Sequence, residues 1–202
     1  MNVRAAIAAC SAAAAIAASP LASFAHDGHH QHGASEAAAT LQRSTQRFEI
    51  PDARLVDTMG HAAAAREVLE AAGPTLVNFV FTSCTAICPV MSATFARLQH
   101  RLGDESTHVR LVSISIDPEH DTPERLAEYA RRFDARPGWA FFTGTAAASL
   151  SLQQAFNVYR GDKMGHDPVT FMRAGAGEPW IRLDGFASVE QLLEEYRRLR
   201  KH

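Results

Sequence analysis

Two cysteines, Cys84 and Cys88, lie four residues apart in the stretch FTSCTAICPVM, between an apolar run and a proline. On a helical turn this spacing places both side chains on one face. The start of a helix favours ionised thiols, which are good nucleophiles and good ligands for soft metal ions. The pair is therefore a candidate metal site, a candidate redox couple, or two small core residues.

The Cys-x-x-x-Cys spacing differs from Cys-x-x-Cys, which is commoner among redox proteins. Because the longer loop is less pre-set for a disulfide, the spacing favours metal binding without excluding redox chemistry. Two sulfurs leave a metal ion under-coordinated, and the natural third ligand is a histidine from elsewhere in the fold. The predicted ordered part offers His61, His100, His108, His120 and His166.

Position along the chain narrows this choice. His100 lies about 18 Å from Cys88 along a predicted helix, at 1.5 Å per residue. His108 opens a predicted strand, which places it at the opposite edge of a parallel sheet. His120 follows a strand on the correct edge, and His166 lies in the turn-rich loop YRGDKMGHDPVTFM. His120 and His166 both remain candidates.

The elements that must position these residues alternate between apolar strands and helices. Strands are predicted at 74–81, 108–116, 138–144, 169–173 and 180–186, and helices at 89–103, 121–133, 146–158 and 188–201. This order predicts an α/β sheet with parallel pairs, covered on both faces, and an antiparallel hairpin at its end. The cysteines follow the strand at 74–81, at the kind of sheet edge where ligands bind.

The segment before that strand has weaker signals. The stretch RFEIPDARLVDTMG alternates around Pro51 and Asp52 and predicts two short strands joined by a turn. HAAAAREVLEAAG has helical composition and ends at Gly73, which suits a helix C-terminus. We expect the ordered domain to span residues 45–202.

Residues 1–25 have the features of an export signal: Arg4 is followed by an uncharged run, and Ser23-Phe24-Ala25 ends in small residues. An uncleaved membrane anchor is the alternative, although an alanine-rich run is barely apolar enough to span lipid. A lipoprotein box ending at Cys10 has too little apolar sequence before it. Cleavage after Ala25 would place the protein in the periplasm and leave Cys84 and Cys88 as its only cysteines.

Residues 26–44 are predicted to be a flexible tether, with four histidines in seven residues and no apolar periodicity. The histidines could bind a metal loosely or be incidental to a solvated linker. They are His26, His29, His30 and His32. Nothing in this stretch fixes a coordination geometry.

Composition limits the class of protein. The chain has 202 residues, 47% of them hydrophobic, and a formal net charge of −2. This is enough apolar material for one core and too little for two domains. Since no basic cluster is interleaved with aromatic residues, nucleic acid is not an expected partner.

Three motifs, FVFTSCTAICPVM, SISIDPEHDTPERL and GHDPVTFM, occur in this order and resemble the SCO/SenC family of copper-binding thioredoxin-fold proteins, over about residues 48–200. The resemblance implies a thioredoxin-like fold, with a central mixed sheet, helices on both faces and an N-terminal β-hairpin extension. It also implies that Cys84, Cys88 and His166 bind one copper ion, as Cu(I) or Cu(II), a donor set that suits both states.

The resemblance further implies a copper chaperone for the binuclear copper centre of cytochrome c oxidase. It would act by metal transfer, by reducing the cysteines of that centre, or by both. The implied partner is the subunit that carries the copper centre, or another periplasmic copper carrier. Membrane association is expected only if the signal segment stays uncleaved.

Three positions depart from the family pattern. Thr85 and Ala86 replace a proline and an acidic residue that are frequent between the cysteines, and Gly165 stands where an aspartate commonly precedes the histidine. Without that carboxylate the imidazole loses a partner that could orient it. Such a loss weakens metal binding about 10- to 100-fold.

Other residues near the motifs are candidates for lesser roles. Asp117 ends a strand near the cysteines, although an Asp-Pro step is more often a turn. Met164 could add a soft ligand, whereas Met91 and Met172 are expected in the core. Pro168 resembles the cis-proline of thioredoxin folds.

Three rival functions use the same residues. A metal-independent thiol-disulfide oxidoreductase needs Cys84 and Cys88 but does not need His166. A peroxidase is indicated by Thr85-x-x-Cys88, but Phe81 stands where peroxiredoxins have proline. Structural zinc normally takes four protein ligands, and the sequence offers three.

Overall fold

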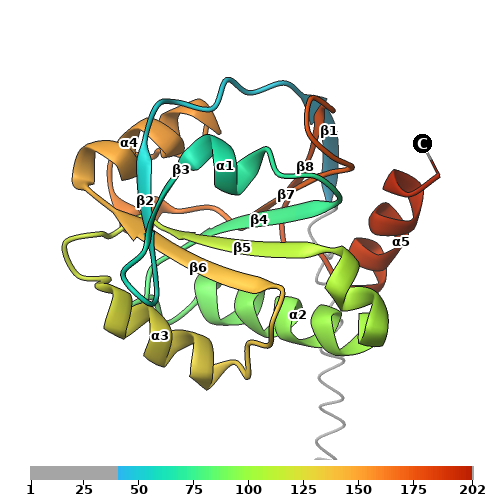
Figure 1. The fold of residues 1–202 in the computed structure, drawn as a ribbon, viewed down its shortest axis with the longest axis horizontal. Coiled ribbons are helices and arrows are strands. Elements are labelled where there is room, and N and C mark those ends of the chain that lie inside the picture. The colour runs from blue at the N-terminus through green and yellow to red at the C-terminus, as the bar shows by residue number, and fades with distance from the viewer. Residues whose placement is uncertain (1–40, 202) are drawn as a thin grey trace, which may run out of the picture. The chain divides into compact units, whose positions relative to one another are not determined.

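The computed structural model describes residues 41–201 of the chain, and the predicted signal segment and residues 26–40 of the predicted tether lie outside this range. Eight strands form a single sheet, in the order β1-β8-β7-β4-β5-β6-β2-β3 (Figure 1). The strands are β1 Gln42–Gln46, β2 Arg54–Asp57, β3 Ala62–Ala64, β4 Thr75–Val80, β5 Arg110–Ser115, β6 Trp139–Gly144, β7 Val169–Arg173 and β8 Trp180–Asp184. The α-helices are α1 Ala65–Leu69, α2 Ile87–Leu102, α3 Pro123–Arg132, α4 Ala146–Ala155 and α5 Val189–Leu199.

The sheet is mixed, as predicted. Strands β4, β5 and β6 are parallel to one another, while β7 pairs antiparallel with β4 and β8 with β7. From β4 to α5 the elements follow the predicted order of alternating strands and helices, closed by the β7–β8 hairpin. Helices join the parallel strands because a parallel connection must cross from one end of the sheet to the other.

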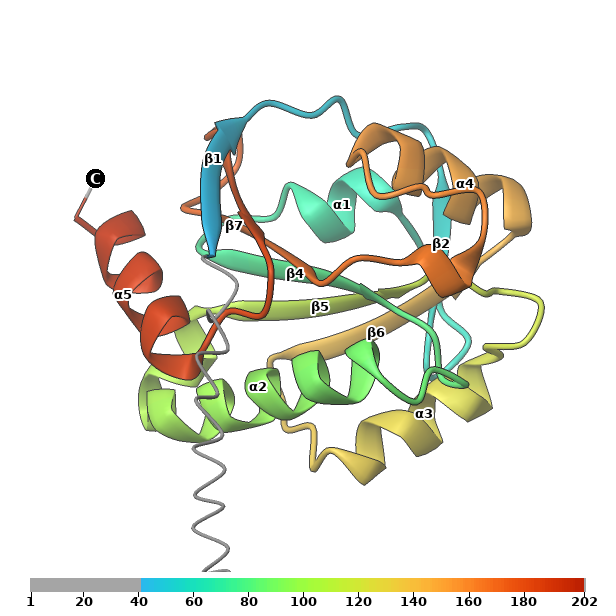
Figure 2. The same cartoon turned by 180° about the vertical axis from the view of Figure 1, so that it is seen from behind.

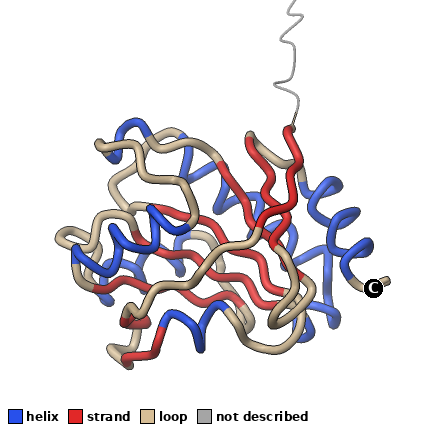
Figure 3. Tube along the Cα trace, turned by 90° about the horizontal axis from the view of Figure 1, so that it is seen from above, coloured by secondary structure: helices blue, strands red, loops and turns tan. Residues whose placement is uncertain are grey.

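Helices cover both faces of the sheet (Figures 1 and 2). One face packs against α1 and α4, with buried residues such as Leu69 and Leu152. The other face packs against α2, α3 and α5, with Leu98, Leu126 and Leu192. Figure 3 shows the central strands in red with the blue helices around them. Strand β4, buried at every position, lies in the middle of this arrangement and ends just before the cysteines.

The N-terminal hairpin lies later in the chain than predicted. The turn is not at Pro51 and Asp52, because residues 47–53 form no strand and the hairpin consists of β2 and β3. The Asp57 carboxylate accepts hydrogen bonds from the backbone N–H groups of Met59 and His61, and Gly60 takes a positive φ of 86°. This local chemistry builds the turn.

The predicted helix over 61–73 is also shorter in the structure, since only Ala65–Leu69 are helical. Ala62–Ala64 instead pair with β2 as strand β3. Alanine composition favours a helix, but the turn after β2 places these alanines beside that strand, where they pair with it. Tertiary pairing has overridden local propensity.

The structured domain begins before the predicted boundary at residue 45. Strand β1 starts at Gln42 and pairs antiparallel with β8 along its whole length. Residues 42–44 therefore belong to the sheet rather than to a flexible tether. None of the helices within residues 41–201 has the length and apolar character needed to cross a membrane.

Candidate metal centre

Both cysteines lie where β4 leads into α2. The chain turns directly after the strand, and the Cys84 N–H donates to the Phe81 carbonyl over 3.1 Å. Helix α2 begins at Ile87, two residues before the predicted start at Pro89. Cys88 is therefore already in the first helical turn, while Cys84 precedes the helix.

Cys84 helps to cap α2. Its Sγ accepts a hydrogen bond from the Cys88 N–H at 3.3 Å, and both thiols are free. The first N–H groups of a helix have no partner within the helix, and one of them here is satisfied by sulfur. The two cysteines therefore meet at the helix start, but the prediction that both lie on the first helical turn is wrong, because Cys84 precedes the helix.

The two thiols differ in burial and charge. Cys88 is fully buried beside Val80 and Phe81, and this burial raises the pKa of its thiol, as do the nearby Cys84 and Asp121. Burial also acts to raise the pKa of Cys84, but hydrogen bonds from the backbone of Cys88, Ala86 and Ile87 lower it below its ordinary value. Cys84 is the more readily ionised and the more accessible sulfur.

This asymmetry predicts selective alkylation of the reduced protein by iodoacetamide. Because the thiolate reacts and the pKa of Cys84 is lowered, Cys84 should reach its full rate at a lower pH than a free cysteine. Cys88 should stay unmodified until the protein unfolds. Peptide mapping by mass spectrometry over a pH series measures both sites, and equal labelling of the two would contradict the assignment.

His166 lies in the loop before β7, after the short 3₁₀ turn Lys163–Gly165. Its side chain is buried, with 4% of the residue exposed, and its Nε2 lies 3.0 Å from the Phe79 carbonyl. Since a carbonyl can only accept, Nε2 carries the proton. Nδ1 is buried with no hydrogen-bond partner. Burial lowers the pKa of His166, so the neutral ring keeps a free lone pair on Nδ1.

This arrangement is typical of a metal-binding imidazole, which usually donates its other N–H to a carboxylate or a carbonyl. Gly165 provides no carboxylate to orient the imidazole, and the Phe79 carbonyl of β4 takes that place as the hydrogen-bond acceptor. Sequence reasoning missed this acceptor because a backbone carbonyl has no residue signature. Nδ1 is the ring nitrogen left for a ligand.

The topology places His166 at the same edge of the sheet as the cysteines. Strand β7 runs antiparallel to β4, so the residues just before β7 meet those just after β4. Phe81 contacts both groups: its ring centroid lies 6.5 Å from that of His166, and it packs with Cys88. Even so, no three His, Cys, Asp or Glu side chains among residues 41–201 stand close enough together to hold a metal.

Ion pairs hold the His166 loop in this position. The Lys163 ammonium lies 2.6 Å from the carboxylate of Asp117, two residues after β5, and the Arg160 guanidinium lies 2.7 Å from the Asp167 carboxylate. Asp117 therefore contacts the loop of the histidine. Binding of one metal by Nδ1 and the two sulfurs requires these groups to lie closer together than they do here.

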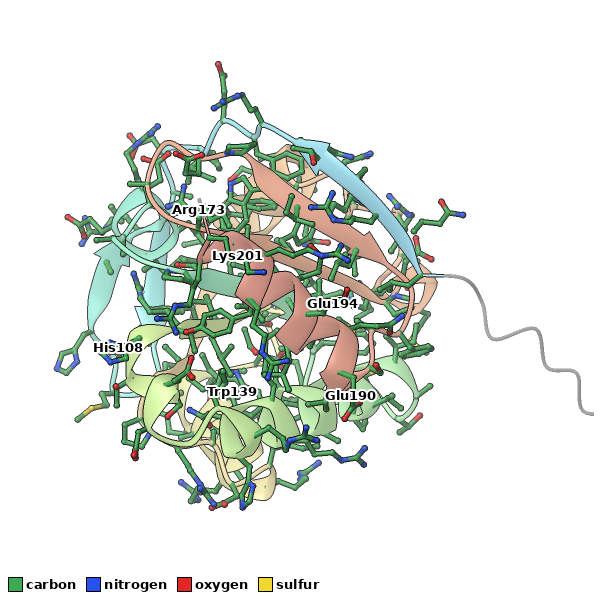
Figure 4. The ribbon with its side chains drawn as sticks, turned by 90° about the vertical axis from the view of Figure 1, so that its right-hand side faces the viewer. His108, Trp139, Arg173, Glu190, Glu194 and Lys201 are labelled. Carbon is green, nitrogen blue, oxygen red and sulfur yellow. The ribbon has the colours of Figure 1, made fainter. Side chains whose placement is uncertain are left out.

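The remaining candidates take other places. His61 contacts Asp57 in the hairpin turn, His120 lies against the Arg125 guanidinium, and His108, labelled in Figure 4, precedes β5 at the far edge. Met91 and Met172 are buried in the core as expected, and Met164 is 72% exposed. No peptide bond in the described range is cis, so the bond before Pro168 is trans.

One buried acid near the cysteines was missed by the sequence reasoning. Asp121 is fully buried and accepts hydrogen bonds from Thr82 and Ser115. In the sequence it stands beside Thr122, which is the N-cap of α3, and so looks like an ordinary residue of a helix start. Only the folded contacts distinguish it.

Comparison with known proteins adds a family assignment. The SCO1/SenC family model matches residues 42–201. The SCO1 protein homolog of Bacillus subtilis is 38% identical over 76 residues, which are 37% of this chain and 39% of that protein. The chain thus spans well under half the length of this curated relative.

Two solved structures resemble the fold. Arabidopsis thaliana ScoI with copper bound has 23% identity and a TM-score of 0.63, over 76% of this chain and 100% of that one. BsSco, a protein in which a disulfide switch was identified, is described as a member of the Sco family of cytochrome c oxidase assembly proteins. It has 22% identity and a TM-score of 0.65, over 77% of this chain and 95% of that one. These likenesses confirm the predicted thioredoxin-like α/β fold.

Proposed function

Because this chain belongs to the SCO1/SenC family, we propose that it is an exported copper chaperone that binds one copper ion through Cys84, Cys88 and His166. The observation that carries this proposal is the state of His166. A buried imidazole with its Nε2–H on a carbonyl and a free Nδ1 is prepared to accept a metal, and an unused buried nitrogen otherwise destabilises the fold.

The donor set determines which ion fits. Two thiolates and one imidazole suit Cu(I), and the same set holds Cu(II) in a more tetragonal geometry with an added ligand. A site that accepts both states can receive and release its cargo. Arabidopsis ScoI, a relative in fold, has been solved with copper bound.

The proposed acceptor is the binuclear copper centre of cytochrome c oxidase, or another periplasmic copper carrier. The name given to BsSco associates its family with assembly of that oxidase. We place the protein in the periplasm because residues 1–25 have the sequence features of an export signal. The protein would deliver copper to the centre or reduce its cysteines.

A second candidate function is that of a metal-independent thiol-disulfide oxidoreductase. Its support is the contrast between an accessible, readily ionised Cys84 and a buried Cys88. This contrast suits an attacking and a resolving thiol. If the protein is an oxidoreductase, its thiol-disulfide exchange activity should survive a His166→Ala change. If it is a copper chaperone, the same change should remove tight copper binding and any activity that depends on copper.

The test is an anaerobic titration of the reduced protein with Cu(I), and separately with Cu(II). We expect one tightly bound copper per chain, with thiolate-to-Cu(II) charge-transfer absorption. A matched variant with glutamine at the tether histidines should keep that ion. The positions to change are His26, His29, His30 and His32. Copper that binds only to the tether would leave the cysteines as a redox pair.

A further inference from the structure

The carboxylate of Asp121 joins the three segments that surround the cysteine turn. Oδ1 accepts from the Thr82 hydroxyl at 2.5 Å and from the Thr82 N–H at 3.1 Å. Oδ2 accepts from the Ser115 hydroxyl at 2.6 Å and again faces the Thr82 N–H at 3.2 Å. Asp121 itself stands just before α3, Ser115 ends β5, and Thr82 follows β4.

These contacts are strong for their type. Asp121 is fully buried, and its partners are hydroxyl and backbone N–H donors rather than a cation. Hydrogen bonds to an ionised oxygen are shorter and roughly twice as strong as neutral ones. Because a buried carboxylate is destabilising unless its acceptor sites are filled, the donors are held firmly to it.

Thr82 is the residue through which this anchor reaches the site. It lies inside the turn in which the Cys84 N–H donates to the Phe81 carbonyl. Both polar groups of Thr82 that can donate are bound to Asp121, so the residue is fixed at its backbone and at its side chain. The turn that carries Cys84 is thereby fixed against β5 and the start of α3.

The position of Cys84 relative to Cys88 depends on this turn. The Cys84 sulfur accepts a hydrogen bond from the Cys88 N–H at the start of α2, and Cys88 is fully buried in the core beside Phe81. A shift of the turn would move one sulfur and leave the other. Asp121 is also near enough for its charge to contribute to the raised pKa of Cys88.

We propose that Asp121 is a positioning residue: by holding Thr82, it places the Cys84 sulfur against that of Cys88 and so sets the copper affinity and the reduction potential of the pair. The copper part rests on the proposed function, and the redox part does not. Asp121 touches neither copper nor sulfur in this role and acts through Thr82.

The test compares four variants with the wild-type protein: Asp121→Asn, Thr82→Val, the double variant, and Thr82→Ser. Two quantities are measured on each, the Cu(I) dissociation constant by competition with a chelator and the thiol-disulfide equilibrium constant of the metal-free protein against glutathione. Glu195→Gln is the matched control, because Glu195, on α5, is also a buried carboxylate. It accepts hydrogen bonds from Arg43 of β1 and from Arg198 of the same helix. Glu190 and Glu194, labelled in Figure 4, mark that helix.

We expect Asp121→Asn to weaken Cu(I) binding about 10- to 100-fold, the usual effect of losing a residue that orients a ligand. The glutathione equilibrium constant should change about tenfold. Thr82→Ser keeps the hydroxyl and should match the wild type, whereas Thr82→Val should show part of the loss. The double variant should bind Cu(I) no more weakly than the more affected single variant, because the two residues act as one unit.

Several outcomes would overturn the proposal. If copper affinity and the redox equilibrium are unchanged in Asp121→Asn, the residue is only structural. The same conclusion follows if Glu195→Gln shifts both quantities as much as Asp121→Asn does. Fully additive single effects would show that Asp121 does not act through Thr82. If Asp121→Asn does not fold, the contrast between Thr82→Val and Thr82→Ser decides. If the wild type binds no copper but the redox constant shifts as expected, the copper function fails and the positioning role stands.

Discussion

Replacing His166 with alanine is expected to weaken copper binding by more than about 100-fold, beyond the 10- to 100-fold loss typical of residues that only orient a ligand. The reason is that Nδ1 is the one unpaired imidazole nitrogen buried in the described domain. Bound Cu(II) should lose its imidazole ligand and change its charge-transfer spectrum. Competition titration and absorption spectra of the two proteins measure the effect.

The control for this variant is His120→Ala. His120 is also a histidine of a loop that follows β5 on the cysteine edge, but it lies against Arg125. Its removal should leave copper binding unchanged. His166→Ala also removes the donor to the Phe79 carbonyl, which should lower the free energy of unfolding by about 1–3 kcal/mol. Undiminished affinity in a folded His166→Ala protein would remove this histidine from the site.

Removing either cysteine is the second change with a large expected effect. Cys84→Ser and Cys88→Ala should each abolish tight copper binding and the thiolate-to-copper absorption, because a single thiolate and an imidazole leave the ion under-coordinated. Met164→Leu, which removes an exposed sulfur from the loop of His166, should change neither. Copper titration of the three variants tests this directly.

The two cysteine variants should differ in their redox behaviour. A disulfide-bonded peptide should form a lasting mixed disulfide with the Cys88→Ala protein, because Cys84 can attack and no second thiol can resolve the product. The Cys84→Ser protein should form almost none, because its remaining thiol is buried and protonated at neutral pH. Equal trapping by both variants would overturn the assigned roles.

Much of the architecture was predictable from local patterns. The uniformly apolar run that became β4 and the proline-started helix after Thr122 are strong signals, and both are where they were expected. The β2–β3 hairpin was displaced because the turn depends on the Asp57 carboxylate and Gly60, while the Pro51-Asp52 step is an equally good turn signal in the sequence. Strand β1 carries the polar sequence QRSTQ, which has no apolar alternation to reveal it.

The candidate site was only partly predictable. Helical spacing indicated that Cys84 and Cys88 would meet, and the family resemblance singled out His166 over His120. The carboxylate of Asp121 and the carbonyl of Phe79 could not be found this way, because each acts through contacts between segments far apart in the sequence. The spacing likewise could not show that Cys84 would lie outside the helix and cap it.

The structure also shows that the three proposed ligands must move closer together to bind one metal, which could not be predicted from the sequence. Cys84, Cys88 and His166 share one edge of the sheet, yet they are not assembled into a three-ligand cluster within residues 41–201. The Lys163–Asp117 and Arg160–Asp167 ion pairs hold the loop of the histidine. Ion pairs with a solvent-exposed partner contribute little to stability, so these two do not prevent the loop from moving when a metal binds.

X-ray absorption spectroscopy of the protein loaded with one equivalent of Cu(I) is the most direct test of the central claim. If Cys84, Cys88 and His166 bind the ion, the spectrum should show copper with two sulfur neighbours and one imidazole, and the imidazole signal should be lost in His166→Ala. A shell made only of imidazole nitrogens would place the metal on other histidines and contradict the assignment of copper to Cys84, Cys88 and His166.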